Sequence, residues 1–518
     1  MSHYQNTDFN EPYSSVSFQY KQPTSPYPYN NSNHADPNNR SIFPRKQQVS
    51  RWLRLHQKSL LLLAAFVLFA LYCMKGIISN YITFISIKMD NTMFDRGYVS
   101  CGLLRKEPML FVQDTHHVQV VWEMNCGMSN KEMMLTYWTD NREKKVVIGP
   151  VDPNVLDPYH TVYKATVGPL SAGPVEYSIE MIKQNSKKKT VARHSFHWFA
   201  SDDQQPIRIA ALADNQFGMM TFSSLLRQIR KFPQQQQPHF LLHAGDAVQN
   251  YPSLRQWQTD FAAPLTMHGL CQRMPLIYAH GNHDYDSVGE YTYTRHHSHD
   301  AQQGPWFSFS MANGAIRFII LDSNLDWDLQ DQWLRQEVES DSFKQAQFRI
   351  VVVHVPPFLE YWDPEAWFQL RQSEWGAFVK DRYVPLFEKG GVNLVISGHQ
   401  HNYERGERHG IHYAIIGGGG GDIDYDQVKD WGMYEAKLLD FHFVMLEFRP
   451  PAVLDQEDTW TLQWDTFNVH GRKVDSVLMA GHPRTSSSQK TWWRRRRRRL
   501  IHKNSNKKGK MTIFRPTS

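Results

Sequence analysis

The chain has 518 residues, which allows about three domains at the usual ~100–200 residues per domain. Its formal charge of +6 conceals a strong asymmetry, because residues 1–58 contribute +4 and residues 484–518 contribute +13, which leaves −11 for residues 59–483. The negative charge of residues 59–483 would repel a long polyanion such as DNA. We therefore expect no nucleic-acid partner.

The N-terminal segment is rich in Asn, Ser, Pro, Tyr and Gln and has no apolar periodicity. Because it lacks the apolar side chains needed for a core, residues 1–50 are predicted to form a disordered tail.

An uncharged apolar run follows at residues 60–74, and residues 76–87 continue it after Lys75. A spanning helix needs about 17–25 residues, so residues 59–81 would suffice if Lys75 extends toward an interface. We therefore predict a transmembrane signal-anchor region within residues 51–85. A cleaved signal peptide is the weaker alternative because of its long leader. A buried helix of a soluble domain fits less well, because a disordered tail precedes the run and a strand pattern follows it.

Basic residues gather on the N-terminal side of this run, including Arg45, Lys46, Arg51 and Arg54. The positive-inside rule then places the N-terminus in the cytosol. The predicted protein is a single-pass type II membrane protein whose body is luminal or extracellular.

Short strand patterns separated by turns fill residues 97–205, for example at 118–123, 132–138 and 175–180. Their length and spacing predict a β-sandwich of about 100 residues that serves as a scaffold. Cys101 and Cys126 flank its first strands and could pair in an oxidising lumen, or remain isolated thiols.

Residues 206–475 alternate strand patterns with helical ones. Apolar residues at helical spacing predict helices over residues 220–230 and 329–338. Together with late strands at 411–416, 432–449 and 460–470, the pattern fits a four-layer αββα sandwich. The predicted fold class is thus mixed α/β and α+β, with a sandwich on its N-terminal side.

Five apolar runs in this region end in polar side chains that can bind a metal. The ends read, in order, Asp214-Asn215-Gln216, Gly245-Asp246, Gly281-Asn282-His283-Asp284, His354 and Gly398-His399-Gln400-His401. Runs of this kind are typical of buried parallel strands, whose carboxyl ends are where open α/β sheets bind ligands. Taken alone, each strand end could equally be an ordinary turn or a structural histidine. The five ends in this order, however, predict one shared metal site.

With these residues the sequence resembles the calcineurin-like metallophosphoesterase superfamily, and within it the purple acid phosphatases, from about residue 97 to residue 475. The closest part is residues 385–394 leading into GHQHNYER at 398–405, and the glycine run at 417–421 falls where that family turns sharply after its last ligand. The strand pattern at 108–123 resembles the fibronectin-type domain that precedes the catalytic domain in the plant enzymes.

The resemblance implies a binuclear metal centre bridged by Asp246. The first metal would take Asp214, Gln216 and His401, and the second Asn282, His354 and His399. Carboxylate and amide oxygens mixed with imidazoles suit Fe, Mn or Zn, whose identities stay open. Two metals ~3.5–4 Å apart would stabilise the attacking and leaving oxygens, and a metal-bound hydroxide would attack the phosphorus.

His283 is the predicted proton donor to the leaving group, with a hydrogen-bonded turn residue as the alternative. Asp284 is predicted to orient its ring and raise its basicity. Two departures from the family pattern stand out. The first motif is usually Asp-x-His, but here the third position is Gln216, a weaker ligand. The tyrosine that the purple enzymes place three residues after the bridging aspartate is Gln249 here, and Tyr251 is not expected to replace it, so we expect no tyrosinate-to-iron colour.

Three further segments carry open interpretations. Residues 295–299, beginning at Arg295, could position substrate oxygens or form an exposed polar loop. The aromatic segment 362–375 could roof the cleft or pack as a surface helix. The basic tail at 484–518, with six consecutive arginines from Arg494 to Arg499, could contact anionic lipid or remain solvated and disordered.

These observations predict an acid phosphatase-like phosphomonoesterase acting on a small phosphate ester. A phosphodiesterase of the same superfamily acting on phospholipids or nucleotides is the nearest alternative. A nuclease and a degenerate cell-surface binding protein are the others.

Overall fold

The computed structural model describes residues 45–126, 132–139, 144–182, 187–199, 205–285, 292–295, 305–324, 327–361, 375–451 and 459–483. The chain divides into two compact units, Met1–Cys73 and Met74–Ser518. Most of the tail predicted at residues 1–50, and all of that predicted at 484–518, lie outside the described residues.

Helix α1 (Arg45–Asp95) contains the apolar run. In the described residues no single helix is long and apolar enough to cross a membrane; one bent pair, His56–Tyr72 with Met74–Asp95, passes that test by length and composition alone. The predicted membrane anchor therefore stays a prediction. Within the second unit, α1 packs through a stripe at helical spacing that includes Thr83, Ile87, Asn91 and Phe94, all buried.

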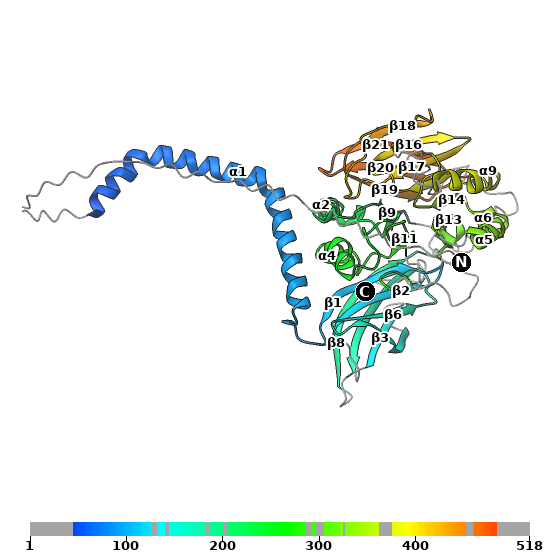
Figure 1. Ribbon diagram of the computed structural model, residues 1–518, viewed down its shortest axis with the longest axis horizontal. Coiled ribbons are helices and arrows are strands. Elements are labelled where there is room, and N and C mark those ends of the chain that lie inside the picture. Colours follow the sequence, from blue (N-terminus) through cyan, green and yellow to red (C-terminus); the bar gives the residue numbers. More distant parts are fainter. Residues whose placement is uncertain are drawn as a thin grey trace, which may run out of the picture. The chain divides into compact units, whose positions relative to one another are not determined.

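In the described part of residues 104–198, eight strands lie in two layers (Figure 1). One layer has the order β1-β2-β6-β5, from β1 (Leu104–Val112), β2 (Val118–Asn125), β5 (Pro153–Asp157) and β6 (His160–Val167). The other has the order β4-β3-β7-β8, from β3 (Glu132–Thr139), β4 (Lys144–Val151), β7 (Gly173–Ile182) and β8 (Lys188–Trp198). Apolar side chains of both layers belong to one core, in which Trp122 stacks on Tyr163. Cys101 and Cys126 form a disulfide, so the paired alternative holds.

This β region continues directly into the following one, because β1 pairs in parallel with β11 (Leu276–Tyr278). The resulting ten-stranded sheet also contains β9 (Ile207–Leu212), β10 (Phe240–His243), β19 (His442–Arg449), β20 (Thr461–Asn468) and β21 (Lys473–Ala480). The sequence predicted a sandwich beside the next domain, whereas the structure shares one sheet between them. The fibronectin-type assignment and the domain limits stay predictions.

A seven-stranded sheet forms the second large layer, in the order β12-β13-β14-β15-β17-β16-β18. Its strands are β12 (Phe307–Met311), β13 (Ile316–Ile320), β14 (Phe348–Val352), β15 (Leu394–Ser397), β16 (Tyr403–Arg408), β17 (Ile411–Ile416) and β18 (Tyr434–Leu438). β13, β14, β15 and β17 run parallel, so their carboxyl ends share one edge.

Alternation along the strands separates the two faces of each sheet. In β9, Ile209 and Ala211 enter the core that both large sheets share, while Ala210 and Leu212 pack against α2 (Met219–Arg230). The same face carries α3 (Leu254–Gln256), the π-helix Trp257–Ala262 and α4 (Ala263–Met267). Because side chains alternate along a strand, one side of β9 packs against the seven-stranded sheet and the other side packs against helices.

The outer face of the seven-stranded sheet is covered in the same way. The helices described on this face are α5 (Trp327–Glu339), α6 (Asp341–Gln345), α8 (Trp375–Phe378), the π-helix Val379–Tyr383 and α9 (Val384–Gly390). The layers are therefore helix, sheet, sheet and helix. The helices predicted at 220–230 and 329–338 are confirmed as α2 and α5, and the strand at 411–416 as β17. β21 extends past the predicted limit at 475.

Candidate metal centre

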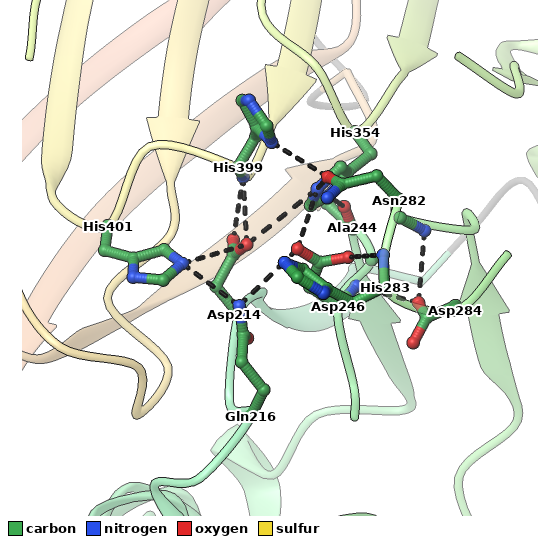
Figure 2. A network of polar contacts seen from close by, with 12 residues as sticks. Asp214, Gln216, Ala244, Asp246, Asn282, His283, Asp284, His354, His399 and His401 are labelled. Atoms are coloured by element: carbon green, nitrogen blue, oxygen red, sulfur yellow. Dashed lines mark hydrogen bonds and ion pairs between the residues drawn. The ribbon is translucent and has the colours of Figure 1, made fainter. Parts of the chain in front are cut away.

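The predicted ligands follow the carboxyl ends of β9, β10, β11, β14 and β15, and the structure brings them together at these strand ends, to which both large sheets contribute (Figure 2). Three of them, Asp214, Asp246 and His399, adopt left-handed backbone conformations with φ of +60°, +56° and +69°. Such conformations cost about 1–3 kcal/mol for a residue other than glycine. Three strained residues at one point are typical of a functional site.

One half of the site joins Asp246, Asn282, His354 and His399. The Asn282 Oδ1 atom lies 3.0 Å from His354 Nε2 and 2.9 Å from His399 Nδ1. Asp246 Oδ2 lies 3.2 Å from His354 Nε2. Ligand atoms of Asp246, His354 and His399 lie within 4.8 Å of one another, a grouping that can hold a metal ion.

The other half joins Asp214, Gln216 and His401. His401 Nε2 lies 3.7 Å from Asp214 Oδ1 and 3.1 Å from Gln216 Nε2, and that same amide nitrogen lies 3.5 Å from Asp246 Oδ2. The Asp246 Oδ2 atom therefore faces both halves. Asp214 is fixed by the backbone N–H of His399, which donates to both of its carboxylate oxygens at 3.0 Å.

Backbone carbonyls orient three of the histidine rings. The Nδ1 atoms of His354, His401 and His283 lie 2.8 Å, 2.7 Å and 2.9 Å from the carbonyl oxygens of Ala244, Asp422 and Gln249. An imidazole that donates from Nδ1 leaves Nε2 available as a ligand or proton carrier. In each ring, therefore, Nε2 is the atom left for chemistry.

Burial and charge shift the pKa values of the site strongly. Burial, the largest single effect, lowers the pKa of His354, but the carboxylates of Asp246 and Asp214 and the Ala244 carbonyl together outweigh it and raise the pKa to about 10. Burial raises the pKa of Asp214 well above its ordinary value, although His354 opposes this. Burial lowers the pKa of His399 well below its ordinary value. Buried carboxyl and imidazole groups that shift one another this strongly are typical of a functional site, and their donor atoms can bind cations.

The predicted role of Asp284 is wrong in this structure. Its carboxylate accepts hydrogen bonds from the backbone N–H groups of Asp246, Ala247 and Gly281 at 2.8–3.1 Å, and from the Tyr278 hydroxyl at 2.8 Å. The ring of His283 is instead oriented by the Gln249 carbonyl. Asp284 therefore fixes the loops that carry the ligands, and burial raises its pKa to about 6.

The donor atoms fit the implied pair of metal ions. Carboxylates, amides and imidazoles are the ligand types that Fe, Mn and Zn share. Gln216 Oε1 is buried without a hydrogen-bond partner among the described residues, while its Nε2 faces His401 and Asp246. Rotating the amide by 180° would place the oxygen toward both groups, where Gln216 could serve as a ligand and a cation would satisfy the oxygen.

Several supporting contacts were not predicted from the sequence. Gln400 lies between the two ligand histidines, and its Oε1 accepts hydrogen bonds from the backbone N–H groups of Glu360 and Tyr361 at 2.8 and 2.9 Å. Its Nε2 donates to Glu404 at 2.7 Å. The glycine run lies against the first ligand loop, where Gly421 N–H donates to the Asp214 carbonyl at 2.8 Å. The GHQHN sequence predicted a loop that carries metal ligands, but it did not predict which other segments hold that loop in place.

Tyr251, Arg295 and the aromatic segment 362–375 were the other residues considered from the sequence. The Tyr251 hydroxyl accepts a hydrogen bond from the Thr292 backbone N–H at 3.4 Å. Arg295 donates to the Pro305 carbonyl at 2.6 Å and stacks over Phe307. The rest of the 295–299 segment and residues 362–374 lie outside the described residues, so their predicted roles stay predictions.

Comparison with known proteins agrees with this geometry. Residues 207–403 match the family model described as calcineurin-like phosphoesterase. This region of the chain is therefore similar to calcineurin-like phosphoesterases. The mouse (Mus musculus) serine/threonine-protein phosphatase CPPED1 is 28% identical over 182 residues, which cover 32% of this chain and 54% of that protein. Purple acid phosphatase 1 of Ipomoea batatas is 30% identical over 158 residues, covering 27% of this chain and 31% of that enzyme.

The chain thus spans about half the length, or less, of these curated relatives. A solved structure of the purple acid phosphatase PPD1 from yellow lupin (Lupinus luteus) seeds aligns with a TM-score of 0.58 at 16% identity, covering 72% of this chain and 73% of that one. That likeness shows a shared fold.

Close packing at Gly281 gives a direct test of the site. A Cβ atom there would lie 2.1 Å from Asp246 Oδ1 and 2.4 Å from Asp246 N. Gly281→Ala should therefore displace Asp246 and lower the affinity for Mn²⁺ or Zn²⁺ by at least about 10–100-fold, the range seen when support for a ligand is lost. Calorimetric titration measures this. Gly76→Ala is the control, because a Cβ at Gly76 meets nothing within 4 Å. Equal affinities in both variants would contradict the assignment.

Proposed function

We propose that this chain hydrolyses phosphate esters with two metal ions, as an acid phosphatase-like phosphomonoesterase acting on small substrates. The position of Asp246 carries the proposal, because its Oδ2 atom lies 3.2 Å from His354 and 3.5 Å from Gln216. One carboxylate between two groups of ligands is the arrangement that a bridged metal pair requires. The phosphatase names of the curated relatives support the reaction class.

Each metal ion would bind to one of the two groups of ligands described above. Asp214, Gln216 and His401 would hold one ion and Asn282, His354 and His399 the other, with Asp246 shared. Bound there, Fe, Mn or Zn would supply positive charge to the phosphoryl oxygens and lower the pKa of water.

His283 is the residue that we assign to proton transfer. Its backbone N–H donates to Asp246 Oδ1 at 2.9 Å, and its Nδ1 lies 2.9 Å from the Gln249 carbonyl. Both contacts fix the ring beside the bridging carboxylate and leave Nε2 to give a proton to the departing oxygen.

Asp246→Asn tests the metal-dependent reaction. The amide keeps the size of the side chain but removes the charge that two cations would share, so we expect kcat/KM to fall at least about 100-fold. The measurement uses the full chain loaded with Mn, Zn or Fe, with p-nitrophenyl phosphate and bis-p-nitrophenyl phosphate as substrates. Asp152→Asn, at an exposed position, should retain full activity. An active Asp246→Asn variant would refute the proposal, and a preference for the diester would reassign the substrate class.

His283→Gln separates an acid from a structural residue. General acid catalysis is worth about 10²–10⁴-fold, and it matters most when the leaving group is basic. The variant should therefore lose far more activity on an alkyl phosphate than on p-nitrophenyl phosphate, whose leaving group departs without a proton. His409→Gln, at an exposed histidine, is the control. An equal loss on both substrates would remove His283 from proton transfer.

We further propose that the chain is a single-pass type II membrane protein with the phosphatase region luminal or extracellular, and that the basic C-terminal tail contacts anionic lipid. The exposed apolar side chains of the helical segment at 60–72 support the anchor. The Cys101–Cys126 disulfide supports an oxidising compartment. In sealed microsomes, protease should cut the N-terminal tail and spare residues 97–483 until detergent is added. Digestion of that region without detergent would exclude this topology.

A further inference from the structure

The second half of α1 presents apolar side chains on two opposite faces. One face packs on the body through buried residues, which include Thr83, Ile87, Asn91 and Phe94. The opposite face is exposed over about four helical turns. Its apolar side chains are 44–62% exposed and recur at intervals of four residues, at Ile77, Tyr81, Ile85, Met89 and Met93. We call these five residues the outer stripe. On a helix that only packs against the body, such positions are normally polar.

Polar contacts near both ends of the packed face keep the outer stripe turned away from the body. At the start, Asn80 Nδ2 donates to Ser224 Oγ of α2 at 2.7 Å, and Arg227 of α2 donates to Asn80 Oδ1. At the end, the Asp95 carboxylate pairs with Arg105 of β1. Turning the helix about its axis would break these contacts and expose the packed face. The outer stripe is therefore exposed because of the way this segment is attached.

The apolar part of α1 is longer than a bilayer is thick. From Leu60, where the exposed apolar run begins, to Met93, the path along the helix is about 50 Å at the usual rise of about 1.5 Å per residue. The hydrocarbon core is only about 30 Å thick, so about 20 residues span it. If residues 59–81 span the bilayer, the stripe from Ile85 to Met93 lies beyond the hydrocarbon core. It cannot follow the anchor through the membrane, because the opposite face of the same turns is packed on the body.

Basic residues border the outer stripe. Lys88 lies one turn from Ile85, and its Nζ atom is 5.5 Å from the centre of the Phe84 ring. In α2, which Asn80 contacts, and the residue after it, positions 219–231 carry three basic residues and no acid. Lysines and arginines beside an apolar face suit the interface of a bilayer, where the cations meet lipid phosphates and the apolar side chains enter the acyl-chain boundary.

The width of the exposed apolar surface favours lipid over a second copy of the helix. At about 100° per residue, the positions from Ile77 to Met93 cover about 160° of the helix circumference, and the exposed Ile82 lies within that arc. Two helices that pack along a coiled-coil seam need a narrower stripe with a repeat of about 3.5 residues. A bilayer interface covers a broad face and does not require that repeat.

We propose that the outer stripe inserts into the membrane interface, so that the second half of α1 lies along the bilayer surface and holds the phosphatase region against the lipid headgroups. This inference rests on the proposed membrane anchor and adds a second, non-spanning contact to it. The side of the body that packs on α1, including α2, then faces the membrane, and its basic residues meet anionic headgroups.

Spin labels on single introduced cysteines test this placement. The full chain is reconstituted into vesicles of phosphatidylcholine and phosphatidylserine. Every variant carries Cys73→Ser, which leaves the buried Cys271 and the paired Cys101 and Cys126 as the other cysteines. The measurement compares how often each label collides with oxygen, which concentrates in lipid, and with a water-soluble nickel chelate.

The label at Met89→Cys should favour oxygen, as should a label at Phe66→Cys within the proposed span. A label at Leu329→Cys should favour the nickel chelate, because Leu329 is 41% exposed on α5, in the helical layer on the opposite side of the two sheets. Ile85→Asp places a charge in the outer stripe and should shift the Met89 label toward water. Ser86→Asp adds the same charge on the exposed flank that already carries Asp90, and it should leave the label in lipid.

The outcomes separate the inference from the anchor. A Met89 label as accessible to nickel as the Leu329 label would overturn the inference, while a Phe66 label in lipid would leave the anchor standing. Dipolar coupling between Met89 labels on neighbouring chains would show that a second copy covers the stripe, and would overturn it too. Equal effects of Ile85→Asp and Ser86→Asp would also count against it. A Phe66 label in water would reject the anchor, and the inference with it.

Discussion

The structure depends on the burial of the Asp246 carboxylate between loops from two different sheets. Its oxygens face Gln216, His354 and the backbone of His283. A charge in this position must be compensated, because an unpaired buried carboxylate costs several kcal/mol. The partner that the protein supplies is the His354 imidazole, and a second buried carboxyl group, Asp214, lies beside it. In the described residues, His354 is the positively charged partner that faces Asp246, and a bound cation would compensate the remaining buried carboxyl groups.

The backbone does most of the positioning. Carbonyls of Ala244, Asp422 and Gln249 orient three histidine rings, and backbone N–H groups fix Asp214 and Asp246 through His399 and His283. Asp284 then ties the second and third ligand loops together. Such contacts require strand ends that do not move, which a helix–sheet–sheet–helix arrangement with a shared apolar core provides.

The local patterns predicted much of this. Helical spacing gave α2 within one residue, and the apolar run at 411–416 coincides with β17. The ordered strand ends indicated which side chains the structure would bring together. Non-local pairing could not be predicted, so the joining of β1 to β11 was missed. The role of Asp284 was wrong because adjacent residues in a turn point in different directions, and no sequence pattern shows that the Gln249 carbonyl would orient His283.

The central claim is that two cations share Asp246, and anomalous X-ray diffraction from crystals of the metal-loaded chain tests it most directly. The account predicts two peaks about 3.5–4 Å apart with Asp246 between them, one beside Asp214, Gln216 and His401 and the other beside Asn282, His354 and His399. A single peak beside His354, or metal bound elsewhere on the chain, would contradict it.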